Sequence, residues 1–139
     1  MIHSDTGLCM RLLEGNYAIC QLCSGSSIPE WALGGQWASF TMSPRELSLV
    51  CLEERVPQGV ICQRGWRVLE LQGPVDPNSV GVISRISSAL AEASIPLCVI
   101  SAYETDYFLI RDEDLGRAME VLEGKGSRIG GRSRCGRDR

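Results

Sequence analysis

The fold is decided by the stretch WRVLELQGPVDPNSVGVISRISSALAEA, residues 66–93. Its first residues, Trp66–Leu71, predict a strand, and apolar residues at helical spacing predict a helix from about Asn78 to Ala93. The residues between, Gly73–Gly81, are of the types that strand-to-helix turns need for local reasons. The N–H groups of a helix start also attract a carboxylate, and Asp76 would suit an ammonium. Residues 73–81 therefore form either a plain turn or a site for a small zwitterion.

The residues that follow complete a recognisable order of elements. Pro96 breaks the helix, and residues 97–103 and 105–110 alternate as two strands of a hairpin. Asp112 is the expected N-cap of a second helix that ends at Gly124, and residues 127–129 are expected to add an edge strand. The resulting order β-α-β-β-α-β is that of a ferredoxin-like unit.

The first half of the chain follows the same order with stunted helices. Residues 17–22 predict a strand, residues 28–33 a helical turn, and residues 37–41 and 47–52 a hairpin. The stretch 56–59, which contains Pro57, leaves almost no second helix.

The two predicted hairpins align with each other. Phe40-Thr41 matches Ile100-Ser101 at an offset of 60, and Leu49-Val50-Cys51 matches Phe108-Leu109-Ile110 at an offset of 59, which indicates a duplicated unit. The predicted fold class is α+β with two ferredoxin-like (βαββαβ) units, the first with shortened helices. The expected boundaries are 14–64 and 65–131, with an Arg-rich tail over 132–139.

Composition places the chain among compact proteins. With 139 residues and 44% apolar residues, it suffices for one domain or two small ones that share a core. No apolar run is long enough to cross a bilayer, and the apolar piece at residues 8–13 is too short for a signal peptide. We therefore expect a cytoplasmic protein without a membrane partner.

Charge is unevenly distributed along the chain. The net charge is −3, from 14 basic and 17 acidic residues. Six basic residues and one acidic residue lie from Lys125 on, which leaves 8 and 16 before it, so the body carries about −8 and the tail about +5. An acidic body argues against nucleic-acid binding. The tail has the composition of a disordered, solvated end, and contact with RNA or an acidic partner is the less favoured alternative.

Seven cysteines show no disulfide framework, and most lie in apolar runs, so reduced, buried thiols are expected. Cys20 and Cys23 have the spacing of a dithiol or zinc motif. They fall at the end of a predicted strand, where residues three apart face opposite ways, rather than at a helix start. The only histidine, His3, lies near the N-terminus, so the further ligands that zinc requires are missing.

Catalytic chemistry finds no support in the sequence. A serine or cysteine nucleophile usually needs a base, and His3 is the only imidazole. No glycine-rich nucleotide motif is present. The acidic groups at 53–54 and 112–114 fit the positive ends of helix dipoles. We expect a protein that is not an enzyme, with no catalytic residues, no metal and no cofactor.

Several motifs together resemble the ACT domain found in the regulatory part of aspartate kinases. They are DPNSVGV (76–82), LAEA (90–93) with Ile95-Pro96, Ile100-Ser101 and Thr105-Asp106-Tyr107. A closer resemblance, over about residues 14–122, is to small stand-alone proteins with two ACT units. It is carried by IPEWALGG (28–35), ELSLVC (46–51), EERVP (53–57) and GWR (65–67).

The resemblance implies a regulatory, allosteric module that binds an amino acid or a similar small ligand at an interface between ACT units, in a homodimer. It implies a regulated protein partner and the following ligand-binding residues: Val75, Asp76, Asn78, Ser79, Val80, Gly81, Ile100, Ser101 and Thr105. In this scheme main-chain N–H groups at 79–81 hold the α-carboxylate, the carbonyl of Ile100 accepts from the ammonium, and Asp76 selects the side chain. The alternative is a structural or interaction module that binds no metabolite.

Overall fold

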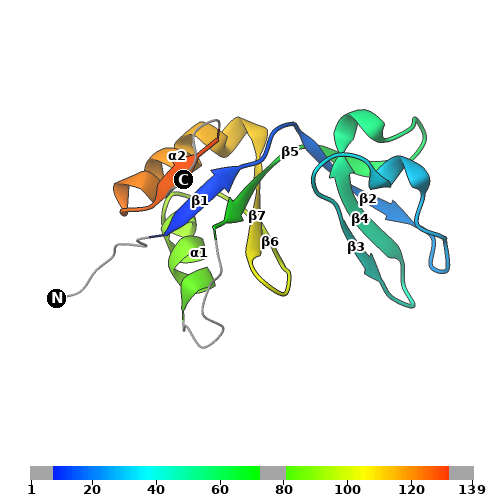
Figure 1. The fold of residues 1–139 in the computed structure, drawn as a ribbon, viewed down its shortest axis with the longest axis horizontal. Helices are drawn as coiled ribbons and strands as arrows, with labels where there is room; N and C mark the ends of the chain where they lie inside the picture. Colours follow the sequence, from blue (N-terminus) through cyan, green and yellow to red (C-terminus); the bar gives the residue numbers. More distant parts are fainter. Residues whose placement is uncertain (1–7, 73–80, 132–139) are drawn as a thin grey trace. The chain divides into compact units, whose positions relative to one another are not determined.

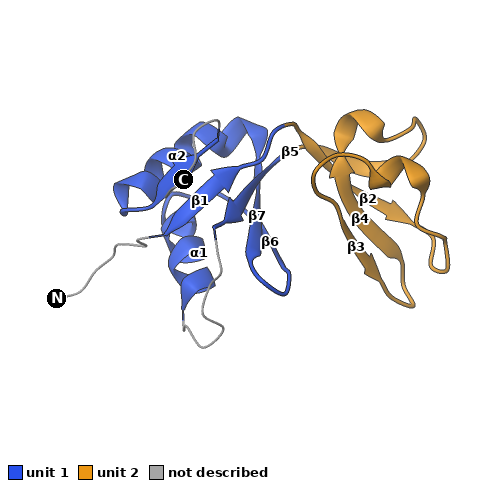
Figure 2. Cartoon of the chain, in the orientation of Figure 1, with its two compact units in different colours: residues 1–14, 67–139 blue, residues 15–66 orange. Residues whose placement is uncertain are grey.

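A computed structural model describes residues 8–72 and 81–131. The chain forms two compact units (Figures 1 and 2). Unit 1 comprises Met1–Glu14 and Arg67–Arg139, and unit 2 comprises Gly15–Trp66. Unit 2 is thus inserted in the sequence of unit 1. The long strand β5 (Ile61–Leu71) begins in unit 2 and ends in unit 1.

Unit 1 contains a mixed sheet and two helices. Its described elements are β1 (Cys9–Leu12), the end of β5, α1 (Val82–Glu92), β6 (Cys98–Ser101), β7 (Asp106–Arg111), the 3₁₀ turn η3 (Asp112–Asp114), α2 (Leu115–Gly124) and β8 (Arg128–Gly130). From β5 on, the order β-α-β-β-α-β confirms the sequence prediction. The strands lie in the order β8-β1-β5-β7-β6. β1, for which the sequence predicted no element, pairs antiparallel with β5 and parallel with β8.

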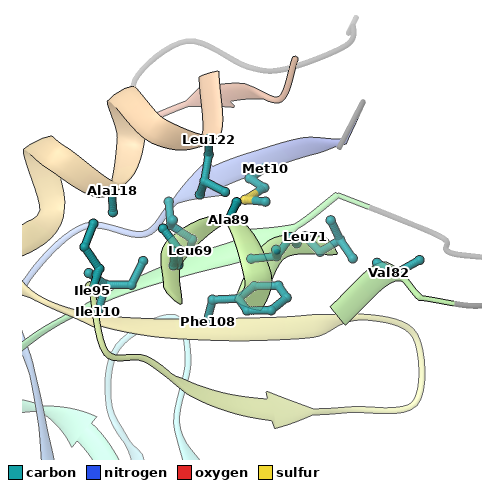
Figure 3. Packing of buried hydrophobic residues seen from close by; sticks show 12 residues of the cluster. Met10, Leu69, Leu71, Val82, Ala89, Ile95, Phe108, Ile110, Ala118 and Leu122 are labelled. Atoms are coloured by element: carbon teal, nitrogen blue, oxygen red, sulfur yellow. The ribbon is translucent and has the colours of Figure 1, made fainter. Parts of the chain in front are cut away.

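Alternate strand residues of unit 1 face the helices and form its core. Met10, Leu69, Leu71, Phe108 and Ile110 are at most 1% exposed. They pack with apolar side chains of both helices, among them Ala118 and Leu122 of α2, as Figure 3 shows. Because strand side chains alternate, the residues between them point to the face away from the helices. Arg11, Glu70 and Tyr107 belong to that second face.

Unit 2 is built from strands and two short 3₁₀ turns. Its elements are β2 (Tyr17–Leu22), η1 (Glu30–Leu33), β3 (Ser39–Met42), β4 (Leu47–Leu52), η2 (Glu53–Arg55) and the start of β5, with strand order β3-β4-β2-β5. The predicted order with shortened helices is therefore confirmed. Val56 has the extended backbone that a residue before proline favours, with φ −77° and ψ 121°. Pro57 thus explains why no helix follows η2.

A β-bulge adapts β5 to β2. Tyr17 pairs with Trp66 and Ile19 with Gln63, so β5 carries one extra residue between these two pairs. Gly65 in this segment has φ +84°, and its N–H donates to Oε1 of Glu53 at 2.8 Å. Glycine adopts this left-handed backbone without the steric cost that a Cβ atom brings.

The predicted hairpin repeat appears in the structure with a single offset of 59 residues. β3 and β6 begin at 39 and 98, β4 and β7 at 47 and 106, and η2 and η3 at 53 and 112. The cross-strand register is the same, since Phe40 pairs with Leu49 and Val99 with Phe108. The offset of 60 for the first strand was therefore wrong by one residue.

The start of the second helix differs from prediction. Residues 112–114 form η3, and α2 begins at Leu115 without a side-chain cap. Oδ1 of Asp112 instead lies 3.4 Å from Nη1 of Arg67. The predicted cap at Asp112 was wrong because its carboxylate pairs with an arginine on β5. The other predicted helix is seen as Val82–Glu92, and residues 78–80 lie outside the described part.

The cysteines correct another prediction. Cys20 and Cys51 are buried free thiols, as expected. Cys23 and Cys98 are free but exposed, and Cys9 is disulfide-bonded. The prediction of reduced, buried thiols was therefore wrong for these three residues.

Candidate functional site

The predicted ligand residues fall into two groups. Val75, Asp76, Asn78, Ser79 and Val80 lie outside the described residues, as do His3 and residues 132–139 of the tail. Gly81, Ile100, Ser101 and Thr105 are described.

Gly81 occupies the N-cap position of α1. It has φ +84°, and a Cβ atom added there would meet nothing within 4 Å. Its carbonyl accepts from the N–H of Arg85 at 2.9 Å and so starts the helix. The left-handed backbone therefore explains the glycine, whereas close packing does not.

Thr105 connects the β6–β7 hairpin to the end of β5. Its hydroxyl donates to the carbonyl of Leu71, and its own carbonyl accepts from the N–H of Ala102 at 2.8 Å. Gln72 follows Leu71 and precedes the predicted ligand loop. The structure thus brings Thr105 next to the point where that loop leaves the sheet.

A pocket of about 440 Å³ lies at this point in unit 1. It is lined by Glu70, Leu71, Gln72, Ala102, Tyr103, Glu104, Thr105 and Tyr107. Its size lies within the range of small-molecule sites. Carboxylates, phenols, a hydroxyl and an amide offer hydrogen-bond partners for a polar ligand. Of the four predicted residues that are described, Thr105 is the one that lines it.

A polar network forms one wall of the pocket. Oε1 of Glu70 accepts from Nε and Nη2 of Arg11 at 3.2 and 3.0 Å, and Oε2 lies 3.3 Å from the hydroxyl of Tyr107. Burial, and after it the Glu70 carboxylate, raises the pKa of Tyr107 above its usual 10.0. Tyr107 therefore stays protonated at neutral pH and donates to Glu70. The guanidinium of Arg11 balances the charge of this carboxylate.

The strand β6 lies beside the pocket and, among the described strands, pairs only with β7. The bond between Ala102 and Thr105 closes the hairpin, and hydrogen-bonded and non-bonded pairs alternate from there. Ile100 is consequently bonded to Tyr107, whereas the main-chain groups of Val99 and Ser101 face outward. The Ile100 side chain shares the face of Tyr107, because directly opposed residues point the same way.

Sequence reasoning missed most of the pocket wall. Glu70 near the end of β5 and Gln72 directly after it alternate with the apolar residues Leu69 and Leu71, a signal that they share a face. Their connection to Arg11 depends on the pairing of β1 with β5. Such long-range pairing is invisible in local periodicity.

The equivalent turn in unit 2 is held by hydrogen bonds from other side chains of that unit. Ser43 and Glu46 stand 59 residues before Ala102 and Thr105, and the N–H of Ser43 likewise bonds to the carbonyl of Glu46 at 3.0 Å. Oε1 of Glu46 accepts from Nε2 of Gln21 at 3.0 Å, and the hydroxyl of Ser24 donates to the carbonyl of Ser43. Side chains of β2 and the loop after it therefore already hold this turn.

Within residues 8–72 and 81–131, no group of three or more His, Cys, Asp or Glu side chains is placed to hold a metal ion. Over the same ranges no helix is long and apolar enough to span a membrane.

The fold defines a class of α+β proteins built from ferredoxin-like units. A family model described as an ACT domain matches residues 61–124. A second model, for an N-terminal domain, matches residues 15–59. Residues 61–124 are therefore an ACT domain. ACT domains are regulatory rather than catalytic, and no catalytic family is indicated.

Two solved structures match over most of both chains. A protein from Agobacterium tumefaciens is 31% identical, with a TM-score of 0.85, and the match covers 94% of this chain and 98% of that one. A Vibrio cholerae protein of unknown function, described as a possible transport protein, is 20% identical over 87% of this chain and 91% of that one, with a TM-score of 0.71. Among functionally curated proteins, none matches.

The regulatory subunit of aspartate kinase from Thermus thermophilus has the same fold. It is 12% identical, with a TM-score of 0.56, and the match covers 80% of this chain and 93% of that one. The family model confirms the predicted ACT domain, and the predicted relation to the regulatory part of aspartate kinases is confirmed as a shared fold.

Proposed function

We propose that the chain is a non-catalytic regulatory module that binds an amino acid or a similar small zwitterion at an interface between ACT units. The observation that carries the proposal is the pocket between the end of β5 and the β6–β7 hairpin. It lies where the predicted ligand loop leaves β5. Family membership adds the regulatory role, because ligand-dependent regulation is what ACT domains supply.

The pocket offers suitable partners for the ammonium end of a zwitterion. Glu104 carries an exposed carboxylate, and the hydroxyls of Tyr103 and Tyr107 can accept a hydrogen bond. Glu70 is already neutralised by Arg11, so it positions Tyr107 rather than binding a second cation. The α-carboxylate is assigned to main-chain N–H groups at 79–81, as the family resemblance implies. Asp76 is assigned to the ligand side chain.

Unit 1 is the favoured binding unit. Its hairpin turn lines a pocket, whereas the equivalent turn of unit 2 is tied to Gln21 and Ser24 by hydrogen bonds. A ligand at that turn in unit 2 would have to displace bonds that the protein makes with itself.

We further propose that the chain acts in the cytoplasm as a homodimer and reports ligand occupancy to a protein partner. Among the described strands β6 pairs only with β7, and the outward main-chain groups of such an edge suit association with a second copy. A ligand that binds one arrangement of subunits better than another shifts the population between them.

A melting screen with the twenty amino acids tests the proposal. A ligand that binds the folded chain raises the free energy of unfolding by RT ln(1 + [L]/Kd) and therefore raises the melting temperature. Glu104→Ala should reduce the rise, and Glu113→Ala, an exposed acid in η3, is the matched control that should preserve it. Unchanged melting with every amino acid at millimolar concentration would favour the alternative, a structural or interaction module without a ligand.

A further inference from the structure

Three cysteines far apart in the sequence meet in the core of unit 2. Cys20 on β2, Cys51 on β4 and Cys62 on β5 belong to one apolar cluster that also contains Leu49 and Val56. Cys20 and Cys62 are direct partners in the register between β2 and β5. The predicted motif partner, Cys23, is exposed beyond the end of β2. In the structure the neighbour of Cys20 is therefore Cys62 on the adjacent strand, and not Cys23.

The register places Cys20 and Cys62 within disulfide range. Directly opposed residues in an antiparallel ladder have Cα atoms about 4.5–5.5 Å apart and side chains on the same face. Disulfides usually span Cα separations of about 4.4–6.8 Å. Cys51 is opposite Ala18 and therefore diagonal to Cys20, so its Cα atom lies farther from Cys20 than that of Cys62, although the thiols of Cys51 and Cys20 also hydrogen-bond.

The two thiols differ in accessibility. Cys20 is 1% exposed, and burial raises its pKa to about 12. Cys62 is only partly buried. A small oxidant therefore reaches Cys62 first, and Cys20 is the neighbour that completes the reaction. The positive charge of Arg64, two residues after Cys62, offsets only part of the rise that burial causes in the pKa of Cys20.

We propose that Cys20 and Cys62 form a reversible modification site, which a hydroperoxide converts to a cross-strand disulfide. The Cys62 thiolate attacks the peroxide, the O–O bond breaks, and a sulfenic acid and an alcohol or water result. The sulfur of Cys20 then attacks the sulfenic sulfur, the S–S bond forms, the S–O bond breaks, and the oxygen leaves as water. Two thiols are oxidised and one hydroperoxide is reduced. The bond fixes β2 to β5 within unit 2.

Peptide mapping tests the site. The full chain is treated with hydrogen peroxide, alkylated with iodoacetamide and digested with trypsin without reduction. Cleavage after arginine places Cys20 and Cys23 in peptide 12–45, Cys51 in 46–55 and Cys62 in 56–64. The expected main product joins 12–45 to 56–64, and dithiothreitol releases it. Fragment ions that separate Gln21 from Leu22 show whether the bond is at Cys20.

Variants provide matched controls. Cys20→Ala should remove the linked peptide, whereas Cys23→Ser and Cys51→Ala should preserve it. A link through Cys23 would overturn the proposal, as would oxidation of Cys62 to a sulfinic acid without a link. The fragment-ion assignment uses the unsubstituted chain, so it decides the question even if Cys20→Ala does not fold.

Discussion

The hydroxyl of Tyr107 on β7 lies 3.3 Å from Oε2 of Glu70 on β5, while Oε1 of the same carboxylate accepts two bonds from Arg11 on β1. One carboxylate therefore links three strands of unit 1 on the face away from the helices. Two of these residues, Glu70 and Tyr107, line the pocket. Their arrangement determines the shape and charge of the pocket wall.

Glu70→Gln should lower the pKa of Tyr107. Burial, the larger cause, remains and keeps the pKa above 10.0, whereas the repulsion between the carboxylate and a tyrosinate is removed. The tyrosinate absorbance measures the titration, and Tyr107→Phe identifies the contributions of Tyr17 and Tyr103. An unchanged curve in Glu70→Gln would contradict the contact.

Tyr107→Phe should lower the free energy of unfolding at pH 7 by about 1 kcal/mol, the usual net value of one hydrogen bond. Because the folded-state pKa of Tyr107 is raised, its contribution is present below pH 10.0 and is lost as the pH rises through the folded-state value. The difference between the two proteins in urea denaturation should therefore shrink at high pH. A difference that grows with pH would be inconsistent with a raised pKa.

Gly81→Ala and Gly116→Ala should change stability in opposite directions. An alanine at the left-handed Gly81, with φ +84°, costs about 1–2 kcal/mol. Gly116 lies inside α2, and a Cβ atom there meets nothing within 4 Å, so alanine should stabilise by about 0.5–1 kcal/mol. Urea denaturation measures both. Equal effects would show that Gly81 is not held in that conformation.

Ser101→Pro should disrupt a dimer that pairs through β6 and leave the hairpin intact. The N–H of Ser101 faces outward, and proline is tolerated on an edge strand at such positions. Ile100→Pro is the control, since its N–H is bonded to Tyr107 and its loss should lower the melting temperature. Analytical ultracentrifugation gives the oligomeric state. A dimer that persists in a folded Ser101→Pro chain would place the interface elsewhere.

Thiol reactivity should follow burial. Cys23 and Cys98 are exposed, whereas burial raises the pKa of both Cys20 and Cys51. At pH 8 iodoacetamide should therefore modify Cys23 and Cys98 well before Cys20 and Cys51. Mass spectrometry of the digested chain at increasing times gives the order. Early modification of Cys20 would mean that unit 2 opens readily.

Local patterns sufficed for most elements because each half alternates strand and helix signals. The helical spacing of Ile86 and Leu90 predicted α1, and Pro57 predicted the missing helix of unit 2. β1 was missed because its place between β5 and β8 depends on pairs such as Met10 with Leu71. The pair Cys20–Cys62 was missed for the same reason, because it depends on the pairing of β2 with β5. The sequence showed only the local motif Cys20–Cys23.

The candidate site was predictable only in part. Thr105 was found through the family resemblance, and its bond to Leu71 places it at the pocket. Glu70 was counted as part of a strand, since nothing near it in the sequence shows that Arg11 and Tyr107 will surround its carboxylate. The direction of the main-chain groups of β6 could not be predicted without the β6–β7 register. That register directs the main-chain groups of Ser101 outward, and not those of Ile100.

Calorimetric titration of the chain with each of the twenty amino acids tests the central claim most directly. The account predicts saturable heat with at least one of them, weakened by Asp76→Ala and unaffected by Glu113→Ala. Absence of heat with all twenty at millimolar concentration would contradict amino-acid binding, and equal weakening by both variants would contradict the assigned site.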